Sequence, residues 1–306
     1  MSSGGSKHPT LRGRLSRRSA LHWGAAIAAG ALLPRHAAGH SEADAPSPAG
    51  DRSSRPRLVP HGYEDLIFAE EFDGPALDWS RWADEMWYGR DDGFGIHADR
   101  KVSPDLWPLS GSTVALVMRM TSEHEWPVYR KPWVVSMLST DPSLVPKGFA
   151  TQYGYFEARM RVPRGPGPWP AFWLMPQSNL GRDRGEYAEI DVMEVMTNKP
   201  TKITSSLHFD KDKVENKTID VKTDLSLDFH VYGVSWEEDY CRFYFDGRET
   251  FRARTPENLK QPMYIILSMT MGGWDRGNAL TAATPLPVRF EIDYVRVWKR
   301  QSPKRS

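Results

Sequence analysis

Apolar and polar residues alternate in short stretches along most of this chain, and turn residues separate the stretches. Residues 155–162 carry apolar residues at every second position, with tyrosine or charged residues between them. Since side chains of a strand point alternately to its two faces, this stretch predicts a strand with one apolar and one polar face. Residues 114–118, 264–269 and 290–298 are rich in β-favouring residues and predict further strands.

A hairpin is predicted between residues 242 and 252. Asp246-Gly247 separates two runs of β-favouring residues there, which is the signal for a type I′ turn. From residue 63 onward the chain shows neither an internal repeat nor a long helical period. Many short antiparallel strands without helices predict an all-β fold, a two-sheet antiparallel β-sandwich.

Residues 1–39 are predicted to be an export signal. Ser16-Arg17-Arg18 precedes an apolar stretch, residues 20–33, that is too short to cross a membrane as an ordinary helix. Paired arginines in this place are typical of a twin-arginine signal, and the alternative is an ordinary secretory leader. Residues 40–60 form a polar Pro/Ser linker, and residues 61–300 fit one large β domain. We expect a periplasmic or extracellular protein without a membrane anchor after cleavage.

Charge and composition narrow the classes of partner. The formal net charge is +1, and because residues 1–45 hold six basic and two acidic side chains, the remainder is near −3. That balance argues against nucleic acid or an anionic membrane and favours a neutral polymer. The chain has 12 Trp, 11 Tyr and 12 Phe, mostly expected in the core, with some lining a groove. Cys241 is the only cysteine, so we expect a packed thiol and no internal disulfide. We also expect the protein to be a monomer.

Three acids lie within residues 189–194 among apolar, β-favouring neighbours. Glu189 and Asp191 project from the same side of a strand, but strict alternation would send Met193 and not Glu194 to join them. One extra residue, a β-bulge at Met193, would bring Glu194 onto that face. Glycoside hydrolysis needs two carboxyl groups in a shared cleft, and this row supplies them. The alternative is an exposed acidic strand without a catalytic role.

The stretch E-I-D-V-M-E resembles the active-site strand of the family 16 glycoside hydrolases in its bulged form. Further stretches match family landmarks in the same order, so that the resemblance covers about residues 60–300: residues 70–74 (EEFDG), 154–160 (GYFEARM), 169–176 (WPAFWLMP) and 290–298 (FEIDYVRVW). The resemblance implies a curved jelly roll with a concave substrate cleft and a retaining mechanism. It assigns Glu189 as the nucleophile, Glu194 as the general acid/base and Asp191 as the residue that orients or tunes Glu189.

The resemblance also implies residues that bind substrate or metal. Trp169, Trp173 and Trp274 match cleft aromatics, although Trp173 could equally belong to the core. His208 matches a position near the reactive subsite and is expected to contact substrate or Asp191. No cofactor is expected for catalysis. A structural calcium ion on the convex side is implied at three residues, Glu71, Gly111 and Asp293; the alternative is that Asp293 simply lies on the polar face of its strand.

The substrate implied is a β-linked polysaccharide cut internally, with a β-1,3-glucan preferred because the bulged motif resembles laminarinase-type members. Agarases and carrageenases share that motif, and mixed-linkage glucan hydrolysis and transglycosylation remain alternatives within the family. Four arginines near the motif could pair with acidic substituents: Arg161, Arg164, Arg182 and Arg184. Two other classes are a non-catalytic glycan-binding sandwich and a metal enzyme that uses the three acids and His208.

Overall fold

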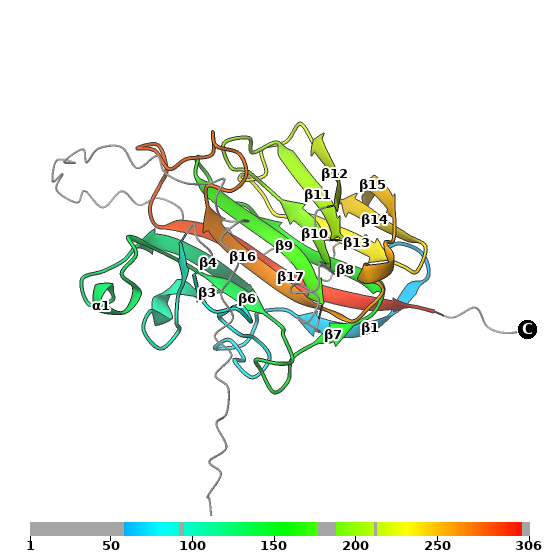
Figure 1. The fold of residues 1–306 in the computed structure, drawn as a ribbon, viewed down its shortest axis with the longest axis horizontal. Helices are drawn as coiled ribbons and strands as arrows, with labels where there is room; N and C mark the ends of the chain where they lie inside the picture. Colours follow the sequence, from blue (N-terminus) through cyan, green and yellow to red (C-terminus); the bar gives the residue numbers. More distant parts are fainter. Residues whose placement is uncertain (1–57, 92–94, 177–187, 211–212, 302–306) are drawn as a thin grey trace, which may run out of the picture. The chain divides into compact units, whose positions relative to one another are not determined.

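The computed structural model describes residues 58–91, 95–176, 188–210 and 213–301, all of which belong to one compact unit, residues 46–306. Two sheets of mainly antiparallel strands dominate it (Figure 1), which confirms the predicted all-β sandwich. Helical elements are short: α1 (Trp126–Tyr129), η2 (Pro104–Leu106) and η4 (Glu257–Leu259). Within these described ranges no helix has the length and apolar character needed to cross a membrane. The predicted export signal and most of the linker lie outside the described residues.

The larger sheet has ten strands. It contains the strands predicted at residues 114–118, 155–162 and 290–298 and both strands of the predicted hairpin. Its order is β15 (Arg248–Arg254), β14 (Tyr240–Phe245), β13 (His230–Trp236), β8 (Gly154–Arg161), β17 (Val288–Arg300), β4 (Thr113–Met120), β5 (Trp133–Val135) and β2 (Ile96–His97); β1 (Tyr63–Glu70) pairs with β17, and β3 (Leu109–Ser110) pairs with β4. The β14–β15 turn has positive φ at Asp246 (46°) and Gly247 (74°), which confirms the predicted type I′ hairpin.

The smaller sheet has seven strands and carries the predicted acids. Its order is β12 (Lys213–Asp220), β11 (Lys202–Phe209), β10 (Ala188–Glu194), β9 (Pro168–Pro176), β16 (Met263–Met271) and β6 (Met137–Ser139), and β7 (Ala150–Thr151) pairs with β16. β10 lies between β9 and β11, so its side chains have neighbours on both sides.

The main apolar core lies between the two sheets. Phe172 and Leu174 of β9 and Ile265 of β16 are fully buried in it, as are Phe156 and the other apolar residues of β8. The one cysteine, Cys241, is buried in this core, as predicted, and burial raises the pKa of its thiol to about 12. The apolar face that alternation predicted for residues 155–162 therefore points into the core.

A second apolar cluster lies on the other face of the seven-stranded sheet. On β16, Tyr264 and Ile266 alternate with the core residues, and they pack with three methionines, Met86, Met137 and Met175. Met86 comes from the segment 83–91, which is tied to β6 by paired backbone hydrogen bonds between Ala83 and Ser139 (2.7 and 2.9 Å). This segment therefore covers the part of the sheet face formed by β6, β16 and β9.

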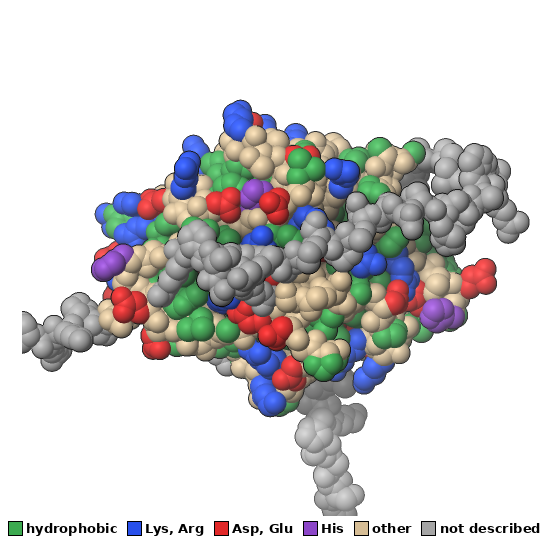
Figure 2. Space-filling view, turned by 180° about the vertical axis from the view of Figure 1, so that it is seen from behind, with side chains coloured by type: hydrophobic (Ala, Val, Ile, Leu, Met, Phe, Trp, Pro, Cys, Tyr) green, Lys and Arg blue, Asp and Glu red, His purple; other side chains and the backbone are tan. Residues whose placement is uncertain are grey.

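Basic and acidic side chains lie next to one another on the face of the molecule shown in Figure 2. Neither sign of charge covers that face. This mixture agrees with the balance of charges in the sequence.

Candidate active site

The three acids lie on β10 around a bulge. On the β11 side, Asp191 pairs with Ser206 and Glu194 with Thr204, so three steps along β10 oppose two along β11. The register to β9 shifts in the same place, between Asp191 and Met193. Val192 and Met193 are consecutive yet both buried in the core. The predicted bulge is therefore present, and it returns Glu194 to the face of the other two acids.

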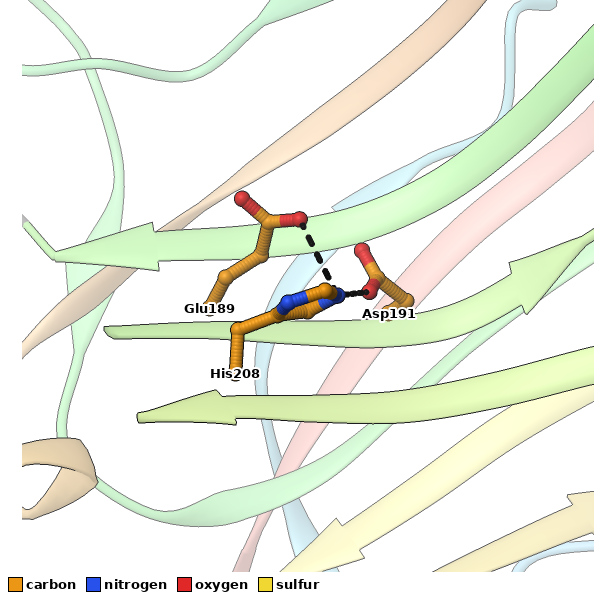
Figure 3. Close-up of side chains that lie close together, drawn as sticks. All are labelled: Glu189, Asp191 and His208. Atoms are coloured by element: carbon orange, nitrogen blue, oxygen red, sulfur yellow. Dashed lines mark ion pairs between the residues drawn. The ribbon is translucent and has the colours of Figure 1, made fainter. Parts of the chain in front are cut away.

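His208 lies beside the first two acids. It pairs with Glu189 across β10 and β11, and its Nε2 lies 2.9 Å from Asp191 Oδ2 and 3.9 Å from Glu189 Oε1 (Figure 3). The contact with Asp191 is an electrostatic pair and not an aligned hydrogen bond. The side chain of Asp191 is 5% exposed and that of Glu189 is 13% exposed, so the group is largely shielded from water. His208 thus meets Asp191, one of its two expected partners.

Glu194 is a weak acid in this environment. Burial raises the pKa of Glu194, the charge of Glu189 raises it further, and the result is about 7. Hydrogen bonds from Trp169, Trp274 and Ser206 act in the opposite direction and lower this pKa. Glu194 therefore keeps a proton near neutral pH.

The ionised form of Asp191 is also disfavoured by burial. Burial raises the pKa of Asp191 well above its ordinary range, and the charge of Glu194 adds to this, against a hydrogen bond with Glu189. A hydrogen bond between two carboxyl groups needs one proton between them. Burial thus favours the neutral form of Asp191, whereas the hydrogen bond with Glu189 favours its ionised form.

Glu189, Asp191 and His208 also form a candidate metal cluster. One ligand atom of each lies within 4.8 Å of the others. Binding a cation would require Asp191 to lose its proton, and its burial opposes that loss. The geometry thus permits three ligands, one imidazole and two carboxylates.

The three candidate tryptophans differ in their surroundings. Trp169 donates from Nε1 to Glu194 Oε1 at 3.1 Å, while Trp274 is 47% exposed and also hydrogen-bonds to Glu194. Trp173 is half-buried against the second apolar cluster and donates to Ser268 Oγ at 3.0 Å. Trp169 and Trp274 therefore converge on Glu194, whereas Trp173 supports a neighbouring part of the same sheet face.

Sequence reasoning missed two serines of this site. Ser206 hydrogen-bonds to Glu194, and Ser268 holds the indole of Trp173. Both are buried; Ser206 belongs to β11, which pairs with β10, and Ser268 belongs to β16, which lies beyond β9. Alternation within those strands would have placed them on the same face as His208 and Trp173, which is the signal that could have found them.

The carboxylates expected to bind calcium are paired with arginines. Both oxygens of Glu71 accept from Arg296, at 2.7 and 2.9 Å, and Asp293 accepts from Arg159 at 2.7 Å. Gly111 lies in the β3–β4 turn with a φ of 63°. A cation would have to compete with both guanidinium groups, so the residues in this arrangement do not fit calcium. Calcium binding by this protein stays a prediction.

Comparison with known proteins gives a family match. The model of the family described as "Glycosyl hydrolases family 16" matches residues 116–296, more than half of the chain. This range contains the three acids, His208 and the three tryptophans.

Two curated relatives are similar over parts of their length. "Glucan endo-1,3-beta-glucosidase A1" of Niallia circulans is 26% identical over 266 residues, covering 77% of this chain and 38% of that protein. "Endo-1,3-1,4-beta-glycanase ExsH" of Rhizobium meliloti (strain 1021) is 33% identical over 159 residues, covering 49% of this chain and 31% of that protein. The chain thus spans about a third of the length of these relatives.

Solved structures share the fold. A crystal structure of SCLam, "a non-specific endo-beta-1,3(4)-glucanase from family GH16", matches with a TM-score of 0.68 at 25% identity, covering 81% of this chain and 95% of that one. The laminarinase catalytic domain from Thermotoga maritima MSB8 matches with a TM-score of 0.66 at 21% identity, covering 78% of this chain and 100% of that one. These matches support the predicted jelly-roll sandwich.

Proposed function

Because this chain belongs to glycosyl hydrolase family 16, we propose that it is a retaining endo-hydrolase of β-linked glucans, with Glu189 as nucleophile and Glu194 as general acid/base. The observation that carries this proposal is the unequal protonation of the two residues. Burial and the charge of Glu189 raise the pKa of Glu194 to about 7, so that Glu194 can hold a proton beside a charged Glu189. An acid and a nucleophile of different charge on one strand face are what double displacement requires.

In the first step, a carboxylate oxygen of Glu189 bonds to the anomeric carbon as the bond from that carbon to the leaving oxygen breaks. The proton of Glu194 moves to the leaving oxygen. The ester formed at Glu189 carries no charge. Since the charge of Glu189 is one cause of the raised pKa of Glu194, that pKa falls at this stage. Glu194 then suits the role of base.

In the second step, Glu194 takes a proton from water, and the water oxygen bonds to the anomeric carbon as the ester breaks. Each displacement inverts the anomeric configuration, so the product retains it. Asp191 and His208 position Glu189 through the contacts shown in Figure 3. Both catalytic carboxyls end the cycle in their starting protonation states.

Support for a glucan comes from the relatives and from the aromatic residues near Glu194. The relatives' names include 1,3 and 1,3-1,4 linkages. Trp274 offers a half-exposed indole that an uncharged sugar ring can stack on. We place a β-1,3-glucan first and a mixed-linkage glucan second. We also propose export through the segment 1–39, on the basis of its paired arginines and apolar stretch.

The test of the nucleophile is Glu189→Ala. We expect hydrolysis of laminarin to be abolished with the fold retained, and added azide to give an α-glycosyl azide from an activated substrate. Glu215→Ala, on the exposed edge strand β12, is the matched control and should keep full activity. Undiminished hydrolysis by the Glu189 variant would contradict the assignment.

The substrate is tested with a panel of laminarin, mixed-linkage glucan, agarose and carrageenan, followed by chromatography of the digests. Laminarin should give short oligosaccharides early and glucose only late. Rapid cutting of agarose or carrageenan with laminarin untouched would overturn the glucan assignment but leave the retaining mechanism in place. Longer products in the presence of excess acceptor would identify a transglycosylase.

A further inference from the structure

A buried asparagine ties together three loops next to Glu194. Asn278 is 1% exposed, and its side-chain oxygen accepts from the backbone N–H groups of Gly167 (2.9 Å) and Asn198 (3.1 Å). Its side-chain nitrogen donates to the carbonyl oxygens of Pro168 (2.8 Å) and Gly272 (3.0 Å). One amide group therefore satisfies backbone groups of three separate segments, which no apolar residue could do.

Each of these segments leads directly to the acid or to one of its indole partners. Pro168 immediately precedes Trp169, and Gly272 stands two positions before Trp274. Asn198 lies four positions after Glu194 itself. These hydrogen bonds of Asn278 go to the backbone of the three segments, so its influence on Glu194 passes through that backbone.

The packing around this group leaves little room for the loops to move. Gly272 donates from its backbone to Gly167 at 2.8 Å. A Cβ added to Gly273 would come within 2.8 Å of the Trp169 ring and 2.7 Å of Met196. Gly273 is therefore packed against both the Trp169 indole and Met196, which leaves the loop that follows β16 little room to move there.

We propose that Asn278 is a positioning residue that holds the indoles of Trp169 and Trp274 against Glu194, and so fixes the direction in which Glu194 delivers its proton. This inference rests on the proposed role of Glu194 as general acid. Proton transfer to a leaving oxygen needs heavy atoms about 2.6–3.2 Å apart, and a displacement of about 1 Å can cost about 10²-fold in rate. Asn278 acts at a distance but controls that geometry.

The experiment is a double-mutant cycle between Asn278→Ala and Trp169→Phe. kcat and KM are measured on laminarin, whose leaving group needs a proton, and on a dinitrophenyl β-glycoside, whose leaving group does not. Thr284→Val is the matched control. The Thr284 hydroxyl donates to the carbonyl oxygen of Pro166 and so also holds a loop of this region to the 165–168 segment, but its bond is not to a residue next to Trp169 or Trp274. Asn278→Ser and thermal unfolding of every variant monitor the fold.

Each single substitution at Asn278 and Trp169 should lower kcat on laminarin by about 10- to 100-fold and affect the aryl glycoside far less. In the Trp169→Phe background, Asn278→Ala should cost little more, because both act on the same contact. Thr284→Val should lower thermal stability without this leaving-group dependence.

Three results would overturn the inference: multiplicative effects of the two substitutions, equal losses on both substrates, or failure of both Asn278 variants to fold, which would assign the residue to the fold alone. A wild-type protein that cuts neither substrate would instead refute the proposed function, and the inference with it. Wild-type hydrolysis combined with any of the three results leaves the proposed function standing.

Discussion

Replacement of Glu194 by glutamine should stabilise the protein in a pH-dependent way. In the folded protein, burial and the charge of Glu189 raise the pKa of Glu194 from its ordinary value of 4.5 to about 7. In the unfolded chain this group returns to its ordinary value. Glutamine has nearly the same shape, and its carbonyl oxygen can accept the hydrogen bond from Trp169, but it carries no charge at any pH.

The magnitude follows from the two pKa values. Below pH 4.5 the carboxyl is protonated in both states and has no effect on the free energy of unfolding. Between pH 4.5 and about 7 the unfolded chain releases the proton while the folded protein keeps it, so stability falls as pH rises. Above pH 7 the full cost is about 3 kcal/mol, at about 1.4 kcal/mol for each pH unit. Glu194→Gln should avoid that cost.

The assay is urea unfolding followed by tryptophan fluorescence at pH 4.5 and pH 8.5. The stability gained by Glu194→Gln over the wild type should be near zero at the lower pH and on the order of 3 kcal/mol at the higher one. Glu215→Gln, on the exposed strand β12, removes the same charge at the surface and should show no comparable gain. An equal effect of Glu194→Gln at both pH values would refute the raised pKa and, with it, the reason for assigning Glu194 as the acid.

Two further outcomes are expected of the enzyme. The kcat/KM of the wild type on laminarin should fall at alkaline pH with a midpoint near 7, because Glu194 loses its proton there. Glu194→Ala should not show this alkaline fall on an activated aryl glycoside. An unchanged alkaline fall in the variant would mean that another group causes it. Ser268→Ala removes the hydrogen-bond partner of the Trp173 indole and should raise KM several-fold with little change in kcat, whereas a loss confined to kcat would contradict a binding role for Trp173.

The fold and the row of acids could be predicted because they depend on local patterns. Alternation identified the strands, and the spacing of the acids at 189–194 required the bulge that the structure contains. These features depend on the period of a strand, which a sequence displays directly. The place of His208 near the acids, in contrast, followed from the family resemblance.

The contacts around Glu194 could not be predicted in the same way. Ser206 and Asn278 are small polar residues of a common kind, and their partners lie on other strands or loops. Their roles depend on the register between strands and on loop conformation, which alternation within one segment does not determine. The raised pKa of Glu194 could not be predicted either, because its largest cause is burial, which depends on the packing of the whole sheet face.

The bulge on β10 has a consequence for how related sequences are aligned. In a strand without a bulge, acids at every second position would all lie on one face, so a chain with one residue fewer between Asp191 and Glu194 would still place three carboxylates together. The extra residue here lies on the core side of β10, where the consecutive residues Val192 and Met193 are both buried. Two enzymes whose acids differ by one in spacing can therefore hold the same constellation in space. A gap at this point in an alignment marks equivalence of the two sites, and an ungapped alignment would match Glu194 to the wrong residue.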